Sequence, residues 1–287
     1  MFKRFPYWVP LLALAIFSVM FGQSPQSTQR IPDSIVNPAT SHAAAGIHID
    51  FVYSQGKPAT QMYVSGDKIR IESGNARGNG VIYDAAAHTM TLLMPMRKSY
   101  MVLDRKSAAQ LGTRLAAAQQ QMQAEMAKLP KAQRAMMEKM MSQGGMGNSH
   151  PKIEIKDLKT SETIDGHHCH DQQVVTNGVP NLKMCVAPVS SLHLPATALK
   201  ALKSMRQDMV NIMSNLGPMA QAYSTMGSRH GFAIKRDVPH REGFKLVTRT
   251  EILKSITRTS PPASLFRIPA NYTRTSMQQM MQGMHSH

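Results

Sequence analysis

Cysteine, tryptophan and acidic residues are scarce in this sequence of 287 residues. Its two Cys exclude a disulfide-dense mini-scaffold and a four-cysteine zinc module. Charged residues make up only 17%, which excludes a highly charged disordered chain, and the length is sufficient to bury a core. Lys and Arg outnumber Asp and Glu by 33 to 17, so the net charge is +16. This charge first suggests nucleic acid, but no zinc finger or aromatic RNA-binding signature accompanies it, and we expect no nucleic-acid partner.

Signatures of the common enzyme classes are also missing. The sequence contains no Gly-x-Ser-x-Gly elbow, no phosphate-cradling glycine loop and no His-Glu-x-x-His motif. The scattered acidic residues form no pair that the pattern would place in one pocket. We therefore expect a binding protein without catalysis and name no catalytic residue.

The first 22 residues have the layout of a secretory signal peptide. Lys3 and Arg4 precede an apolar run, and polar residues follow it. An uncleaved membrane anchor is the alternative, because Met20 is large for a residue just before a cleavage site. We expect a periplasmic or secreted protein, or one anchored in the inner membrane if the signal is not cleaved. Residues 23–45 are rich in Ser, Gln, Pro, Thr and Ala and are expected to form a flexible leader.

From residue 46 onward the hydrophobic period becomes two, which is typical of half-buried strands. Residues 46–104 hold about six short segments of this kind joined by tight turns, which predicts an antiparallel meander. Further strands are predicted at residues 152–159, 168–175, 182–186, 231–236 and 244–256. Residues 46–275 are therefore expected to form a single domain.

Two stretches between the strands carry a helical pattern instead. In the first, Leu111, Leu115, Met122, Met126 and Leu129 fall on one helix face, and Pro130 ends it. The second spans about residues 195–216. A large, curved antiparallel sheet with amphipathic helices covering one face is an α+β fold, in this case a half-open β-barrel.

Methionine is concentrated in these helical stretches. Seven of the 24 Met lie in residues 105–150 and five in residues 195–231. Because Met adapts to varied apolar shapes, the helices could line a ligand cavity, or they could pack on the sheet as permanent core. The candidate cavity residues are Met122, Met126, Met205, Met209 and Met213.

Four short segments carry a resemblance to known proteins. They are residues 66–71 (GDKIRI), 81–84 (VIYD), 94–100 (MPMRKSY) and 265–272 (LFRIPANY). The chain resembles a Met-rich exported bacterial domain family of uncharacterised function, similar in layout to the half-open barrel of the lipoprotein-localisation carriers (LolA-like). In those carriers the concave face of the sheet holds acyl chains beneath helical lids, and residues 265–272 resemble their closing segment. No lipid-contacting residue of the carriers has a counterpart here, so the resemblance implies no site residue.

Cys169 and Cys185 lie eight residues on either side of Asn177, in an Asn-Gly turn dipeptide. In a hairpin that turns there, the two Cys would face each other across the strands. Disulfides persist in the oxidising compartment of an exported protein. We therefore predict a disulfide, worth about 3 kcal/mol in the chain-entropy model.

Histidine offers a second possible chemistry. His168 and His170 would share one face of a strand, opposite Cys169, and imidazole binds zinc or copper well. Residues 276–287 form a flexible Met/His-rich tail with further soft ligands, namely Met280, Met281, Met284, His285 and His287. A periplasmic copper- or zinc-binding protein is thus the alternative function, although a polar strand edge and a frayed terminus would give the same pattern.

The positive charge is not spread evenly. Residues 46–104 and 151–194 are close to neutral, whereas residues 105–150 carry net +5 and residues 195–231 net +3. The same two helical stretches hold the Met excess, a combination suited to an anionic membrane surface or an amphiphile. The main expectation is an exported carrier or binding protein for a hydrophobic ligand, such as a lipid or an acylated molecule.

Overall fold

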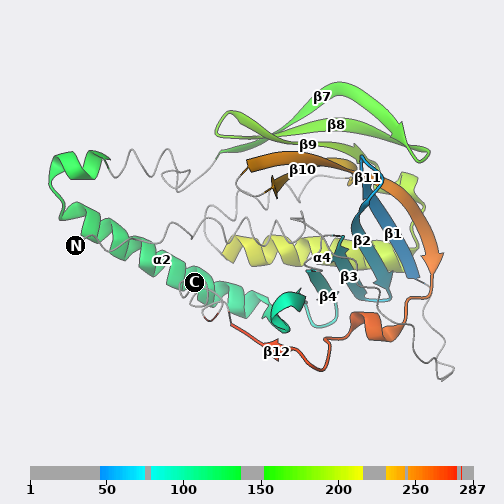
Figure 1. The fold of residues 1–287 in the computed structure, drawn as a ribbon, viewed down its shortest axis with the longest axis horizontal. Helices are drawn as coiled ribbons and strands as arrows, with labels where there is room; N and C mark the ends of the chain where they lie inside the picture. The colour runs from blue at the N-terminus through cyan, green and yellow to red at the C-terminus, as the bar shows by residue number, and fades with distance from the viewer. Residues whose placement is uncertain are drawn as a thin grey trace.

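A single large sheet dominates the computed structural model, which describes residues 46–74, 79–136, 152–215, 231–242, 245–276 and 279. Twelve strands follow the order β12-β6-β5-β4-β3-β2-β1-β11-β10-β9-β8-β7. Neighbouring strands pair antiparallel except β12 and β6, which pair parallel. The sheet is open, with β12 and β7 at its edges, and Figure 1 shows its strands curving past helix α4. The expected large and mainly antiparallel sheet is confirmed, but the fold is mostly sheet and is not a clear α+β arrangement with helices covering one face.

The first half of the sheet is the meander that the alternating pattern predicts. Its six strands are β1 (Gly46–Tyr53), β2 (Pro58–Ser65), β3 (Lys68–Ser73), β4 (Gly80–Asp84), β5 (Thr89–Met94) and β6 (Ser99–Leu103). The turn between β2 and β3 places Gly66 at a positive φ of 58°. Glycine adopts this conformation at little steric cost, which is why the Ser-Gly-Asp sequence allows so tight a hairpin.

The second half of the sheet joins the first through β11, which pairs with β1. Its strands are β7 (Ile153–Ile164), β8 (His167–Thr176), β9 (Val179–Ala187), β10 (Phe232–Glu242) and β11 (Lys245–Thr259). Two-residue turns with positive φ connect β7 to β8 at Asp165-Gly166 and β8 to β9 at Asn177-Gly178. The predicted hairpin is confirmed, and each of these five strands extends beyond its predicted range at one end or both.

Two long helices accompany the sheet. Helix α2 (Arg105–Ala127) begins at Asp104, whose carboxylate accepts the Ser107 backbone N–H in a capping box. Helix α4 (Ala196–Asn215) packs on β2 and β3 and also contacts α2. Among the described helices, none combines the length and the hydropathy that crossing a bilayer requires.

The core lies between one face of the sheet and α4. Every second residue of β1, from Ile47 to Tyr53, is buried in one cluster with Ala198, Ala201 and Ile212 of α4. The start of α2 joins this cluster through Ala108, but most of the rest of the helix is exposed. The apolar face of the sheet is therefore the face that meets α4.

Residues 260–272 form a C-terminal strap. After β11, the strap passes through the short helix η3 (Ala263–Phe266), which contacts β3. The strap is followed by β12 (Thr273–Arg274), which pairs with β6 at the far edge of the meander. At the start of β1, a side chain at Gly46 would collide with the Val64 carbonyl and with Pro261 of the strap. Residues 265–272 thus lie in this strap.

Several expectations concern residues outside the described ranges. These are the signal peptide or anchor (residues 1–22), the flexible leader (residues 23–45) and most of the tail, including its candidate metal ligands Met280, Met281, Met284, His285 and His287.

Candidate functional site

The predicted disulfide between Cys169 and Cys185 is confirmed. Both residues are buried, and their Cα atoms are 5.4 Å apart. The expected direct pairing is wrong, because the two-residue turn at Asn177-Gly178 and a register shift beside Val174 together place Asp171 opposite Cys185. The disulfide therefore runs diagonally between β8 and β9, and neither Cys is free to act as a thiolate ligand or nucleophile.

Two carboxylates flank the disulfide without forming a metal site. Oxygens of Glu162 and Asp171 lie within 4.8 Å of each other and of the Cys185 Sγ, but this sulfur is already bonded. Glu162 accepts hydrogen bonds of 2.6 and 2.8 Å from Lys235, and Asp171 pairs with Lys183 at 2.9 Å. Burial alone would raise the pKa of Asp171, but hydrogen bonds from Thr160 and Lys183 outweigh it and hold that pKa below its usual range. Ion pairing accounts for the charges of both carboxylates.

The histidine pair lies on the solvent side of β8. His168 and His170 are both exposed, and their ring centroids are 4.9 Å apart with the rings nearly perpendicular. Cys169 points to the opposite, buried face, as the strand pattern predicts. His167 lies apart from this pair, since its Nδ1 is 2.9 Å from the Ser191 carbonyl oxygen.

The candidate cavity methionines occupy different environments. Met205 and Met209, one turn apart on α4, are half-buried against the core cluster. On α2, Met126 is half-buried and Met122 is 44% exposed. The side chain of Met213 lies outside the described part of the structure. Within the predicted set, the structure thus brings Met205 and Met209 together.

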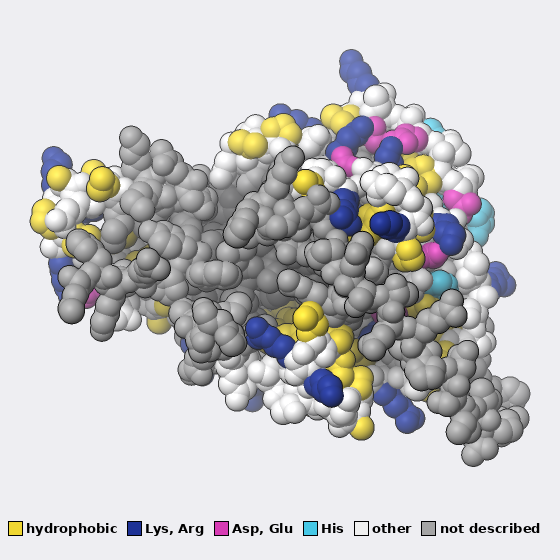
Figure 2. All heavy atoms as spheres, viewed as in Figure 1, with side chains coloured by type: hydrophobic (Ala, Val, Ile, Leu, Met, Phe, Trp, Pro, Cys, Tyr) yellow, Lys and Arg dark blue, Asp and Glu magenta, His cyan; other side chains and the backbone are white. Residues whose placement is uncertain are grey.

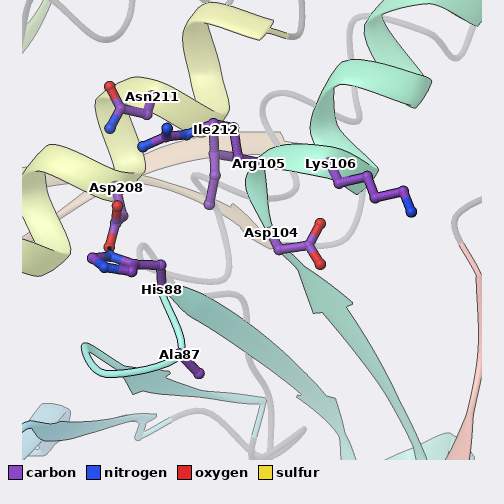
Figure 3. Close-up of a pocket in the computed structure, with 8 residues that line it drawn as sticks. All are labelled: Ala87, His88, Asp104, Arg105, Lys106, Asp208, Asn211 and Ile212. Atoms are coloured by element: carbon purple, nitrogen blue, oxygen red, sulfur yellow. Dashed lines mark hydrogen bonds and ion pairs between the residues drawn. The ribbon is translucent and has the colours of Figure 1, made fainter.

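A pocket of about 370 Å³ lies where the β4–β5 turn, the start of α2 and the middle of α4 meet. Figure 3 shows its lining, which is mostly polar. The lining residues are Ala87, His88, Asp104, Arg105, Lys106, Asp208, Asn211 and Ile212. None of them was a candidate site residue from the sequence.

A buried network supports one wall of this pocket. Tyr83 donates its hydroxyl hydrogen to Oδ2 of Asp208 at 2.6 Å and lies 2.8 Å from the Ser204 Oγ. The same Asp208 oxygen is 2.8 Å from Nδ1 of His88. Burial raises the pKa of the Tyr83 hydroxyl, and the Asp208 carboxylate raises it further, so Tyr83 stays protonated and remains a donor.

His88 connects this network to solvent. It ends the β4–β5 turn with a positive φ of 52°, and its side chain is 66% exposed, whereas the Asp208 side chain is 8% exposed. Because Asp208 accepts through a carboxylate oxygen, Nδ1 of His88 is the donor, and Nε2 is left for another partner.

One signal in the sequence could have revealed this network. Asp208 lies three residues after Met205 and four before Ile212, which places a carboxylate on the apolar face of α4. A buried carboxylate requires partners, and here they are Tyr83 and His88.

No protein-family model matches the sequence, and no curated protein matches it either. Two solved structures are similar at low levels. An uncharacterized conserved protein from Thermus thermophilus has a TM-score of 0.36 and 7% identity, over 82% of this chain and 92% of that one. PNGF-II has a TM-score of 0.38 and 10% identity, over 85% of this chain but only 33% of its own. At these TM-scores neither similarity defines a class for the protein.

Proposed function

We propose that the protein binds a hydrophobic or amphipathic ligand, such as a lipid or an acylated molecule, between the apolar face of the sheet and α4. In this proposal the sheet acts as a half-open barrel, the helices cover its ligand, and no reaction is catalysed. The observation that carries it is the partial burial of Met205 and Met209 against the core. Adaptable apolar side chains at this boundary could cover a ligand without a fixed shape.

The apolar boundary is wider than these two residues. Other partly buried side chains pack against the same core from α2, α4 and the strands, including Met62, Met94, Leu111, Leu199 and Leu202. Burying further apolar area against a ligand contributes about 25 cal/mol per Å². This boundary supports binding of an apolar chain.

The end of α2 and the residues that follow it support an anionic membrane surface as a partner. Met122 is 44% and Met136 69% exposed, and Lys128, Lys131 and Arg134 lie between them in sequence. Figure 2 shows hydrophobic and basic side chains mixed at the end of the molecule where α2 lies in Figure 1. A basic helix with exposed apolar side chains is suited to an anionic bilayer, as an exported, periplasmic carrier would require.

We expect the Met205→Ser/Met209→Ser double variant to bind a fluorescent fatty acid at least about tenfold more weakly than the natural chain, because it loses apolar area at the boundary. Met96→Ser is the matched control, since Met96 is 75% exposed at the β5–β6 turn and should leave binding unchanged. Fluorescence titration of the full chain measures the affinity, and thermal unfolding checks that both variants are folded. A natural chain that takes up no fatty acid, and that native mass spectrometry shows empty after gentle purification, would contradict the proposal.

Zinc or copper binding is the second candidate, and the exposed His168 and His170 pair favours it. We expect the His168→Asn/His170→Asn variant to bind Zn²⁺ or Cu⁺ at least about tenfold more weakly, because two imidazole ligands are lost. His193→Asn is the control, because His193 is also exposed and its φ of 49° suits Asn. Metal titration of the full chain and of a form ending at residue 276 separates the strand pair from the tail. Absence of micromolar binding by the natural chain would end this candidate.

A further inference from the structure

The polar pocket lies next to the apolar boundary on the same helix. Asp208, Asn211 and Ile212 line the pocket, and Met205 and Met209 belong to the adjoining turns of α4. Residues three or four apart on a helix are neighbours, about 5–6 Å between Cβ atoms. A ligand with one polar and one apolar end could therefore place the two ends in adjacent environments.

The pocket contains a positively charged side chain, Arg105, that could bind an anion. In Figure 3 the Arg105 side chain runs from the start of α2 toward α4 and Asn211, whereas Lys106 points away from them. Among the described residues, the Arg105 side chain makes no hydrogen bond or ion pair, and it lies exposed at the pocket rim. A guanidinium presents parallel N–H donors that match a carboxylate or phosphate.

The two carboxylates of the pocket are already engaged. Asp104 accepts the backbone N–H of Ser107 at 2.6 Å, and hydrogen bonds of this kind hold the pKa of Asp104 below its usual range. Asp208 accepts from Tyr83 and His88. The capping carboxylate also occupies the first amides of α2, so an incoming anion would meet side chains rather than a free helix terminus.

From this arrangement we propose that the pocket binds the anionic headgroup of the amphipathic ligand, a phosphate monoester or a group of similar charge. Arg105 provides the bidentate contact, Asn211 donates from its side-chain amide, and the imidazole of His88 forms part of the polar lining. Asp208 is a positioning residue that orients the imidazole through Nδ1. This assignment rests on the proposed function, because it places the acyl chain of the same ligand along Met205 and Met209.

The test compares two probes of equal acyl length, a lysophosphatidic acid and a neutral monoacylglycerol, each titrated into the full chain by calorimetry. We expect the phosphate probe to bind about tenfold more tightly, the gain typical of a charge-assisted hydrogen-bonded pair. Arg105→Gln should remove this preference and leave monoacylglycerol binding unchanged. Lys57→Gln is the matched control, because it removes the same charge from an exposed position in the β1–β2 turn, away from the pocket.

The outcomes separate the two proposals. If both probes bind equally and Arg105→Gln changes neither, the headgroup site is overturned while the carrier function stands. If Lys57→Gln reduces the preference as much as Arg105→Gln, general electrostatic attraction explains it and the site is again overturned. If inorganic phosphate binds as tightly as the lipid probe, the pocket is a site for free phosphate and the headgroup assignment fails. If neither amphiphile nor phosphate binds, both proposals fail.

Discussion

Replacing Arg236 with Met should destabilise the domain by about 3–5 kcal/mol, because it leaves a buried carboxylate without its counter-charge. Glu251 is only 1% exposed and lies on β11 directly opposite Arg236 of β10. Two guanidinium nitrogens, Nε and Nη2, donate to Oε2 of Glu251 at 2.9 and 2.7 Å. Met keeps most of the apolar stem of Arg236 and removes only the guanidinium, whose central carbon lies 5.3 Å from the centroid of the Phe51 ring, so the measured loss reports on the charge. Urea unfolding followed by circular dichroism gives the change in free energy.

A second substitution tests the cause of this loss. Arg236→Met/Glu251→Leu should recover most of the stability, since apolar residues of similar volume commonly replace a buried ion pair at little cost. Lys128→Met removes one member of an exposed ion pair with Glu125 and should leave the unfolding midpoint unchanged. If the double variant is no more stable than Arg236→Met, the loss comes from packing around these strands and the electrostatic explanation is wrong.

The Cys169→Ala/Cys185→Ala variant should lose about 3 kcal/mol of unfolding free energy. The disulfide closes a loop with a sequence separation of 16 residues and so restricts the unfolded chain. Both sulfurs lie inside the core cluster, so the variant also loses part of the packing between β8 and β9. Thermal and urea unfolding measure the effect.

Reductant provides the control for the disulfide. Added during unfolding, it should lower the stability of the natural chain toward that of the Ala variant and leave the variant itself unchanged. In the folded state the bond should resist reduction, because both Cys are almost fully buried. A natural chain that remains equally stable with and without the disulfide would contradict the chain-entropy argument.

The fold was predictable wherever neighbouring residues decide it. The alternating patterns from Ile47 onward and the Asn177-Gly178 turn specify strands and hairpins locally, and the structure contains them. The pairing of β1 with β11 follows from no local pattern, because it joins segments from opposite ends of the domain. The exposure of most of α2 was not predictable either, because a helical pattern does not show which element its apolar face will contact.

The candidate site divides in the same way. The disulfide follows from the position of two Cys around a turn, but the register shift beside Val174 changed which residues lie opposite each other. The pocket is lined by the β4–β5 turn, the start of α2 and part of α4, which are far apart in the sequence. No local sequence pattern therefore predicts it. Only Asp208 could have been noticed in the sequence, because a carboxylate on the apolar face of α4 predicts buried polar partners.

The C-terminal strap bears on the order in which this protein folds. The meander from β1 to β6 has short-range contacts and can form early. Its two outer strands, β1 and β6, nevertheless wait for β11 and β12, which are synthesised last. Until then both strands expose unpaired backbone, a state prone to association with other chains. We therefore expect docking of the strap to be a late folding step.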